Sequence, residues 1–312
     1  MMLNKALIIL LALSLHTLAS GQRSNIYLFD IRQDDGGKIS LADPRFLTAF
    51  NAQGVNTDPS FFSPNELYIV SQLANAIQTD IYKLDLIKFT KTQVTSTPES
   101  ETAPARMPDM YNFSAIRREK DGRDSLLRLW QFPVDQLTNG KPLFKYLSGV
   151  EEYYWLNSRD IVIYKGGDPT TLSIMDTNND KLETIATNVG HTFARMPNGN
   201  LAFVQKSRYD DWKLMEKNLY RPKEVPRTII ETLPGAEHFA VLPDGTFLMA
   251  KGSKIYKYNK FSDDNWKEAV DLRFYEIRNI TKLVVGPERV VSTGTGKGQT
   301  TGFATPIAIV AE

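Results

Sequence analysis

The chain has 312 residues, of which 42% are hydrophobic, so it can bury a substantial core. Its 37 basic and 36 acidic side chains give a formal charge of +1, so we expect no nucleic-acid partner and no binding to an anionic membrane surface. The sequence contains no cysteine, which excludes disulfide bonds and a lipid-modified N-terminal cysteine.

The N-terminal segment has the pattern of a secretory signal peptide. A lysine precedes the apolar stretch Ala6–Leu15, and small residues follow at Ala19–Gly21, with Thr17–Ala19 as the other cleavage candidate. We expect residues 1–21 to be removed and residues 22–312 to form one domain, in the periplasm or outside the cell. The apolar stretch is short for a membrane span and no later segment approaches one, so we expect no integral membrane segment.

The stretch Pro59–Leu86 sets the pattern for the rest of the chain. It predicts strands at Ser60–Phe62, Leu67–Ser71 and Asp80–Leu86, with turn chemistry at Ser63–Glu66. The turn recurs at anchor positions 64, 108, 157, 197, 243 and 287, which are 44, 49, 40, 46 and 44 residues apart; each anchor is a proline except Asn157. A period in the forties with several short strands is typical of a β-propeller with one four-stranded blade per repeat. Six anchors therefore predict an all-β, six-bladed propeller.

The same pattern places the other strands in chain order. Asn25–Asp30 matches the third strand of the repeat, so the mature chain is expected to begin in mid-blade, with a fourth strand within Lys38–Phe50. The remaining predicted strands are Lys91–Ser96, Tyr111–Arg117, Leu126–Phe132, Leu143–Tyr146, Ile161–Tyr164, Thr171–Met175, Leu182–Ala186, Leu201–Gln205, Trp212–Glu216, Thr228–Thr232, Phe247–Lys251, Lys254–Tyr258 and Ala269–Leu272.

The C-terminal segment Ile307–Glu312 resembles the second strands of the earlier repeats. The last blade is therefore expected to take two strands from the C-terminus and two from the N-terminus, which closes the ring and leaves no free edge between them. An insertion that contains Gly294, Gly296, Gly298 and Gly302 precedes this strand, and its composition predicts a flexible loop.

Three motifs carry a family resemblance: S-P-N at Ser63–Asn65, P-D-G at Pro243–Gly245 and D-I-Y-K-L-D at Asp80–Asp85. They resemble the TolB-type, WD-like propeller repeats of bacterial envelope proteins, over essentially the whole mature chain. The resemblance implies a propeller of the kind used as a protein-docking scaffold or attached to a peptidase; a separate group carries metal-dependent polysaccharide-lyase chemistry. Because we expect neither the N-terminal α/β domain of TolB nor a following peptidase domain here, a role in the Tol system is not implied.

Motifs for nucleophilic catalysis are absent. The mature chain has two histidines, His191 and His238, no thiol and no G-x-S-x-G elbow. The glycine-rich segment Gly294–Thr300 lacks the spacing and the Ser or Thr of a phosphate-binding loop.

Polar residues recur six positions before each anchor, where the first strand of a blade begins. The set is Asp58, Thr102, Glu151, His191, Glu237 and Thr281, with Glu152 and His238 one residue later in two repeats. Because the first strands lie innermost in a propeller, these side chains are expected to converge at the mouth of the central channel. Carboxylates and imidazoles are ligands for a divalent cation, and such a cation would require both imidazoles neutral, with titration expected near pH ~6.5. The alternative is that these residues are polar because strand ends meet solvent.

Two functions remain open on the sequence. The first is an exported, monomeric, non-enzymatic scaffold without a cofactor, which binds a protein or another envelope component. The second is a metal-dependent lyase or hydrolase with its site at the channel mouth, formed by Asp58, Glu151, Glu152, His191, Glu237 and His238.

Overall fold

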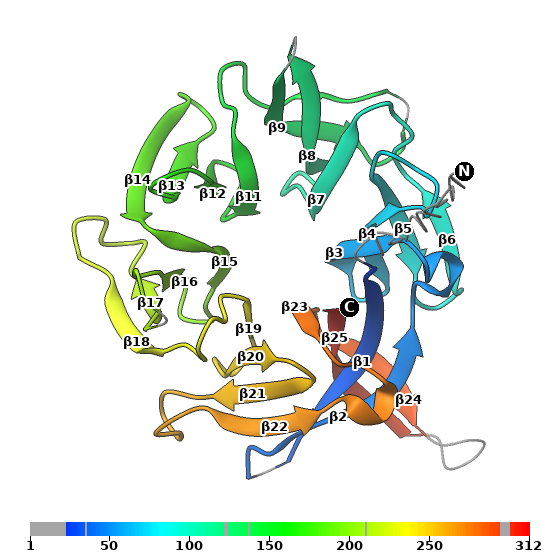
Figure 1. The fold of residues 1–312 in the computed structure, drawn as a ribbon, viewed down its shortest axis with the longest axis vertical. Coiled ribbons are helices and arrows are strands. Elements are labelled where there is room, and N and C mark those ends of the chain that lie inside the picture. Colours follow the sequence, from blue (N-terminus) through cyan, green and yellow to red (C-terminus); the bar gives the residue numbers. More distant parts are fainter. Residues whose placement is uncertain (1–22, 35, 122–123, 137, 210, 294–299) are drawn as a thin grey trace, which may run out of the picture.

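A computed structural model describes residues 23–34, 36–121, 124–136, 138–209, 211–293 and 300–312. Its strands form six sheets arranged in a ring around a central axis (Figure 1). This confirms the six-bladed propeller that the anchor spacing predicts. The expected signal peptide lies outside the described residues. Within those residues, no helix is long and apolar enough to cross a membrane.

Five blades are meanders of consecutive strands, numbered here in chain order. Blade 1 contains β3 (Val55–Ser63), β4 (Glu66–Gln72), β5 (Asp80–Asp85) and β6 (Thr90–Gln93). Blade 2 contains β7 (Ser100–Arg106), β8 (Asn112–Asp121), β9 (Asp124–Pro133) and β10 (Lys141–Pro142). Blade 3 contains β11 (Val150–Trp155), β12 (Asp160–Lys165), β13 (Thr171–Asp176) and β14 (Lys181–Thr187). Blade 4 contains β15 (Val189–Arg195), β16 (Leu201–Gln205), β17 (Lys213–Lys217) and β18 (Arg227–Glu231). Blade 5 contains β19 (Phe239–Val241), β20 (Phe247–Lys251), β21 (Lys254–Tyr258) and β22 (Lys267–Asp271).

Blade 6 joins strands from both ends of the chain. Its order from the axis outwards is β23 (Ile280–Val285), β25 (Thr300–Ala311), β1 (Asn25–Gln33) and β2 (Ile39–Phe46). The clasp is formed by β25, which pairs antiparallel with β23 on one side and with β1 on the other, so that Ile309 lies opposite both Leu283 and Tyr27. The predicted closure is therefore confirmed.

Two local predictions are wrong. The insertion before the clasp contains a hairpin, in which β24 (Arg289–Thr293) pairs with the first part of β25, and Gly302 lies in this ladder; Gly294, Gly296 and Gly298 are outside the described residues. The outer strand of blade 2 is Lys141–Pro142 rather than Leu143–Tyr146. There the Arg128 guanidinium donates to the carbonyls of Phe144 and Lys145, so these groups do not enter a ladder.

The core lies between neighbouring blades, because both faces of each sheet are covered. The second strands have continuous buried runs, such as Leu67–Ser71 in β4 and Leu201–Val204 in β16. Sheets covered on both faces give such runs rather than alternation of polar and apolar residues.

The antiparallel order of each blade gives the disc two distinct faces. On one face lie the beginnings of the innermost strands and the connections between second and third strands; we call it the mouth face. The turns between first and second strands and between third and fourth strands lie on the other face, which we call the turn face.

Candidate functional site

The predicted site residues all lie on the mouth face, close to the axis. Asp58 is in β3, Glu151 and Glu152 are in β11, and His191 is in β15, while Glu237 and His238 immediately precede β19. Thr102 and Thr281 occupy the same positions in β7 and β23. The structure arranges these side chains in two contacting groups.

The first group, which we call the axial cluster, consists of Asp58, Glu152 and Lys282. The Lys282 ammonium lies 2.9 Å from Asp58 Oδ1 and 3.1 Å from Glu152 Oε1, and it thereby links blade 6 to blade 1 and to the opposite blade 3. The second oxygen of Asp58 accepts a hydrogen bond from the Ala103 backbone N–H at 3.2 Å. The three side chains are only 17–25% exposed, so their charges are poorly screened by water.

These contacts shift the pKa values of the axial cluster. Burial is the largest cause at Asp58 and acts to raise its pKa, but the charge and hydrogen bond of Lys282, together with the hydrogen bond from the Ala103 backbone N–H, outweigh it, and the pKa of Asp58 is lowered. Burial likewise opposes the ammonium, yet Asp58 and Glu152 together raise the pKa of Lys282 above its ordinary value. At Glu152 burial dominates the attraction of Lys282, and its pKa is raised. Lys282 is therefore a permanent cation at the axis.

His238 lies beside this cluster. Its Nδ1 is 2.7 Å from the Thr192 hydroxyl, a contact between the neighbouring blades 4 and 5. Burial, followed by the charge of Lys282, lowers the pKa of His238 to about 4. Its imidazole is therefore neutral at neutral pH.

The second group, the His191 cluster, consists of Glu151, His191, Lys206 and Glu237. Nδ1 of His191 is 3.1 Å from Glu237 Oε1, and its Nε2 is 3.6 Å from Glu151 Oε2. Lys206 forms an ion pair with the other oxygen of Glu237. The hydrogen bond to Glu237 is the main cause that raises the pKa of His191. At Glu237 burial acts to raise the pKa, but the hydrogen bonds and charges of His191 and Lys206 outweigh it and hold the pKa at about 2.

A cavity of about 340 Å³ opens beside both groups, between blades 5 and 6. Its lining includes Glu237, His238 and Lys282 from the two groups, together with Lys251 and Asn279. The mouth face can therefore receive a small polar ligand next to these charges. In the part of the chain that the structure describes, however, no three side chains of His, Cys, Asp or Glu come together in a geometry that could hold a metal ion. The carboxylates are matched by Lys282 and Lys206 instead.

Sequence reasoning missed Lys282, although a signal for it exists. The residues one position after the polar set include Glu152, Thr192, His238 and Lys282. All four take part in the contacts around the axis. Comparing this second column of the repeats would have placed a lysine among the carboxylates.

The turn face differs in character, because it carries most of the exposed large apolar side chains. Ten of them lie in its turns and in the β24–β25 hairpin: Ile87, Phe89, Met110, Tyr111, Val134, Tyr220, Val225, Phe261, Val290 and Phe303. Seven belong to the consecutive blades 6, 1 and 2, and we call these the apolar sector: Val290, Phe303, Ile87, Phe89, Met110, Tyr111 and Val134.

Two residues of the apolar sector have left-handed backbone conformations. Phe89 has φ +55° and is 76% exposed, and Met110 has φ +66° and is 56% exposed. Met110 takes the place that Gly199 and Gly245 occupy in the corresponding turns of blades 4 and 5. Bulky residues are unfavourable in this conformation, at a cost of about 1–2 kcal/mol each.

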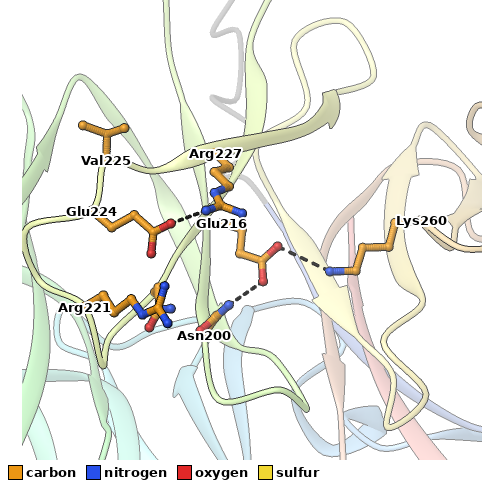
Figure 2. A pocket seen from close by; sticks show the side chains of 8 residues that line it. Asn200, Glu216, Arg221, Glu224, Val225, Arg227 and Lys260 are labelled. Carbon is orange, nitrogen blue, oxygen red and sulfur yellow. Dashed lines mark hydrogen bonds and ion pairs between the residues drawn. The ribbon is translucent and has the colours of Figure 1, made fainter.

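The turn face also has a polar cavity of about 370 Å³ between blades 4 and 5 (Figure 2). Glu216 there accepts hydrogen bonds from Asn200 at 2.6 Å and from Lys260 at 3.4 Å, and Glu224 pairs with Arg227. Its acidic groups are thus matched within the cavity, in contrast to the exposed apolar side chains of the sector.

The fold and the two faces define a six-bladed propeller with a charged axial cluster and an apolar sector. No protein-family model and no curated protein matches the sequence. Among solved structures, TolB from Acinetobacter baumannii is similar with a TM-score of 0.55 and 15% identity, over 74% of this chain and 60% of that one. A putative TolB from Agrobacterium tumefaciens is similar with a TM-score of 0.56 and 14% identity, over 80% of this chain and 89% of that one. A chain of a nidogen/laminin complex is similar with a TM-score of 0.55 and 12% identity, over 78% of this chain and 91% of that one. The likeness shows the fold, a β-propeller.

Proposed function

We propose that this chain is an exported, non-enzymatic scaffold that binds a protein partner through the turn face. The apolar sector is the observation that carries the proposal. Apolar side chains that gather on one side of a soluble protein are typical of a protein–protein interface.

The backbone of the sector supports this function. Met110 and Phe89 adopt left-handed conformations although their side chains remain largely exposed. Packing within the chain gains little from them, whereas a partner that covers them would gain apolar contact area. Unfavourable backbone conformations of this kind concentrate at binding sites.

Similar folds take part in protein assemblies. One of the similar structures is part of a nidogen/laminin complex, in which a propeller of comparable size occurs with another protein. This precedent supports a docking role for the fold and leaves the identity of the partner here open.

The test compares capture of a partner by variants of the two faces. Affinity-tagged protein is crosslinked in the cell envelope and recovered, and its crosslinked products are compared between variants. We expect the double variant Met110→Gly/Tyr111→Ser to lose the product, because both side chains belong to the sector. The control, Tyr209→Ser/Phe274→Ser, removes two exposed aromatic side chains from the mouth face and should retain it. The opposite pattern would overturn the proposal.

The second candidate is a metal-dependent lyase or hydrolase at the mouth face, and the convergence of Asp58, Glu152 and the His191 cluster favours it. A divalent cation at the axis would have to displace Lys282 from its carboxylates. Elemental analysis of protein purified without chelator decides between the candidates: a stoichiometric, tightly held cation supports the enzyme. Loss of that cation in the double variant His191→Ala/His238→Ala, with the fold retained, would locate it.

A further inference from the structure

A groove between blades 6 and 1 lies at the edge of the apolar sector. Its volume is about 310 Å³, and it runs between the end of β2 and the turn that joins β5 to β6. Its apolar lining consists of Phe46, Leu47, Phe50, Leu84, Leu86 and Phe89. Leu84 and Leu86 are buried beneath it, whereas Phe46 and Phe89 remain exposed. The groove thus offers an apolar floor between two aromatic side chains.

The rim of the groove is positively charged. The Arg45 guanidinium lies 5.9 Å from the centre of the Phe89 ring and donates a hydrogen bond to the Leu86 carbonyl at 3.1 Å. The Lys91 ammonium lies 4.8 Å from the centre of the Phe50 ring. Among the described residues, neither cation has a carboxylate within ion-pair distance. A negatively charged ligand would give both Arg45 and Lys91 an ion-pair partner.

The acidic groups nearby are already engaged. Asp85, the acidic residue in the lining, accepts the backbone N–H groups of Ile87 and Lys88 at 2.9 and 2.8 Å. The charges of Asp30 and Asp43 act on Arg45, but Asp30 is bound by Arg289 at 2.6 Å and Asp43 by Arg32 at 3.1 Å. The free charge at the rim is therefore positive.

Phe89 gives an independent indication that the groove has an occupant. Its left-handed backbone is unfavourable for an aromatic residue, and in the equivalent turn of blade 3 this position is Asp180, with the same φ of +55°. The turn therefore forms with a residue that tolerates the conformation better. A ligand that packs on the exposed ring accounts for the presence of phenylalanine here.

We propose that this groove binds an extended, acidic peptide segment of the partner that also carries aromatic or aliphatic side chains. The apolar side chains would fill the floor, and the carboxylates would contact Arg45 and Lys91. The outer strand β6 borders the groove and pairs only with β5 among the described strands, so its outer edge is open to an extended backbone. This edge favours a peptide over a lipid. The inference rests on the proposed scaffold function.

The first experiment measures binding directly by fluorescence polarisation. The probe is a short fluorescein-labelled peptide in which glutamate alternates with leucine and phenylalanine. One control peptide has lysine in place of every glutamate, and another has serine in place of every leucine and phenylalanine. We expect each control to bind about tenfold or more weakly, because each lacks one of the two complementary features. Equal binding of all three peptides would overturn the proposal.

The second experiment separates binding from folding. Phe89→Asn should weaken binding of the acidic peptide about tenfold and at the same time raise Tm, since asparagine tolerates the left-handed conformation. Lys91→Glu should weaken binding, whereas the matched control Lys181→Glu, at the start of the outer strand of blade 3, should leave it unchanged. Unchanged peptide binding by Phe89→Asn and Lys91→Glu would overturn the proposal. Binding of phosphatidylglycerol vesicles in place of the peptide would also overturn it. So would self-association of the protein that Phe89→Asn abolishes.

The two proposals fail in different ways. If the groove variants weaken peptide binding but the Met110→Gly/Tyr111→Ser variant keeps its crosslinked partner, the groove is a peptide site and docking through the sector is wrong. If that double variant loses its partner while the groove variants bind the peptide normally, the scaffold function stands and the groove assignment is wrong.

Discussion

The two faces of the disc differ in whether their prominent side chains have partners within the chain. On the mouth face, Lys282 matches Asp58 and Glu152, and His191 contacts Glu237. On the turn face, the large apolar side chains of blades 6, 1 and 2 are 36–81% exposed. The comparison indicates that the mouth-face charges stabilise the ring itself, whereas the turn-face side chains are available to another molecule.

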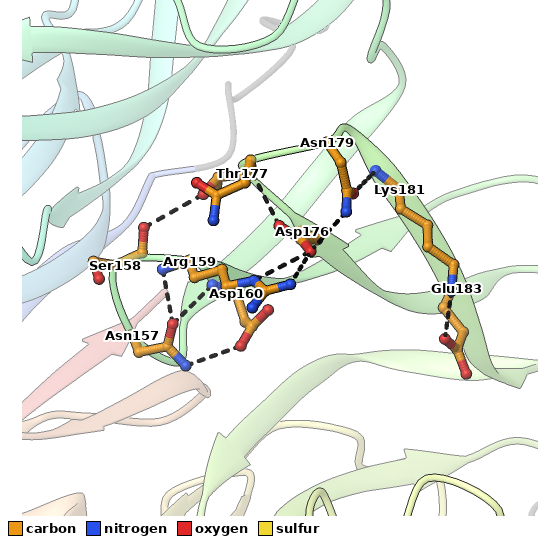
Figure 3. A network of polar contacts seen from close by, with 10 residues as sticks. Asn157, Ser158, Arg159, Asp160, Asp176, Thr177, Asn179, Lys181 and Glu183 are labelled. Carbon is orange, nitrogen blue, oxygen red and sulfur yellow. Dashed lines mark hydrogen bonds and ion pairs between the residues drawn. The ribbon is translucent and has the colours of Figure 1, made fainter.

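The turn face also differs between blades. The turns after β5 and β13 both begin with an aspartate that accepts backbone N–H groups, Asp85 and Asp176, and both contain a left-handed residue four positions later. In blade 3 the surrounding groups are polar and satisfy one another: Arg159 binds Asp176 at 2.7 Å, and Asn157 binds Asp160 at 3.1 Å (Figure 3). The same turn backbone thus forms with polar residues in blade 3. The backbone conformation therefore does not explain why the turn of blade 1 carries apolar residues.

The largest expected effect is at the axis. Lys282→Met leaves Asp58 and Glu152 close together and without a cation, so the free energy of unfolding should fall by about 2 kcal/mol, after allowance for their partial exposure. Urea titration measures it. The control Lys251→Met removes an exposed lysine from the same face and should change stability by about 0.5 kcal/mol or less. Similar losses in both variants would show that the axial charges are not a stabilising network.

The two histidines should make the free energy of unfolding depend on pH in two different ranges. His238, with its pKa lowered to about 4, stays neutral when folded while the unfolded chain binds a proton, so stability should fall between pH 6.5 and 4, by about 2 kcal/mol. His191, with its pKa raised, contributes stability that is complete below pH 6.5 and is lost as pH rises through the folded pKa. Chemical unfolding across pH measures both. In His238→Gln the loss on the acid side should shrink, and an unaltered profile would contradict the assignment.

A substitution in blade 3 tests the meaning of Phe89. Asp180→Phe places an aromatic residue on the same left-handed backbone and should lower the free energy of unfolding by about 1 kcal/mol. Thermal unfolding provides the measurement, and the reverse change Phe89→Asp should give a gain of similar size. Should neither variant change Tm, the conformation costs nothing here and loses its value as an indicator of function.

The smallest expected effect is at Met110. Met110→Gly restores the glycine of the related turns, so it should raise the free energy of unfolding by about 0.5 kcal/mol; relief of the backbone is partly offset by the greater freedom of glycine in the unfolded chain. Denaturant unfolding can resolve this change if Gly199→Ala, which should destabilise, is measured in parallel. A loss of stability in Met110→Gly would mean that the side chain packs within the chain.

The sequence predicts the ring well because the blades share one repeat. The anchor turns and the buried second strands recur with a constant period, and Ile307–Glu312 matches that pattern closely enough to reveal the clasp. Outer strands such as Lys141–Pro142 are short and exposed, so no hydrophobic pattern marks them. The hairpin of β24 and β25 escaped prediction because its glycine content is typical of a loop.

The candidate sites were predictable only in part. The start of each innermost strand is fixed by its distance from the anchor, and Asp58, Glu151 and His191 do lie in innermost strands. Their role as a ligand-binding site stays a prediction. The pKa values were not accessible from the sequence, because they depend on contacts of the folded chain: burial and Lys282 lower the pKa of His238 below the expected value near 6.5, whereas the hydrogen bond to Glu237 raises that of His191. The apolar sector depends on which turns share a face and on backbone dihedral angles, although methionine at the glycine position of the Met107–Met110 turn was a readable sign.

The clasp also determines the order in which the molecule can assemble. Blades 1 to 5 are each formed from contiguous sequence, but β1 must wait for β25, which follows every other strand in the chain. Contacts of such long sequence separation form slowly, since a large loop must close before they can stabilise it. Until then, the apolar strand Asn25–Gln33 has one unpaired edge, and a nascent ring is most exposed to pairing with another molecule at this strand.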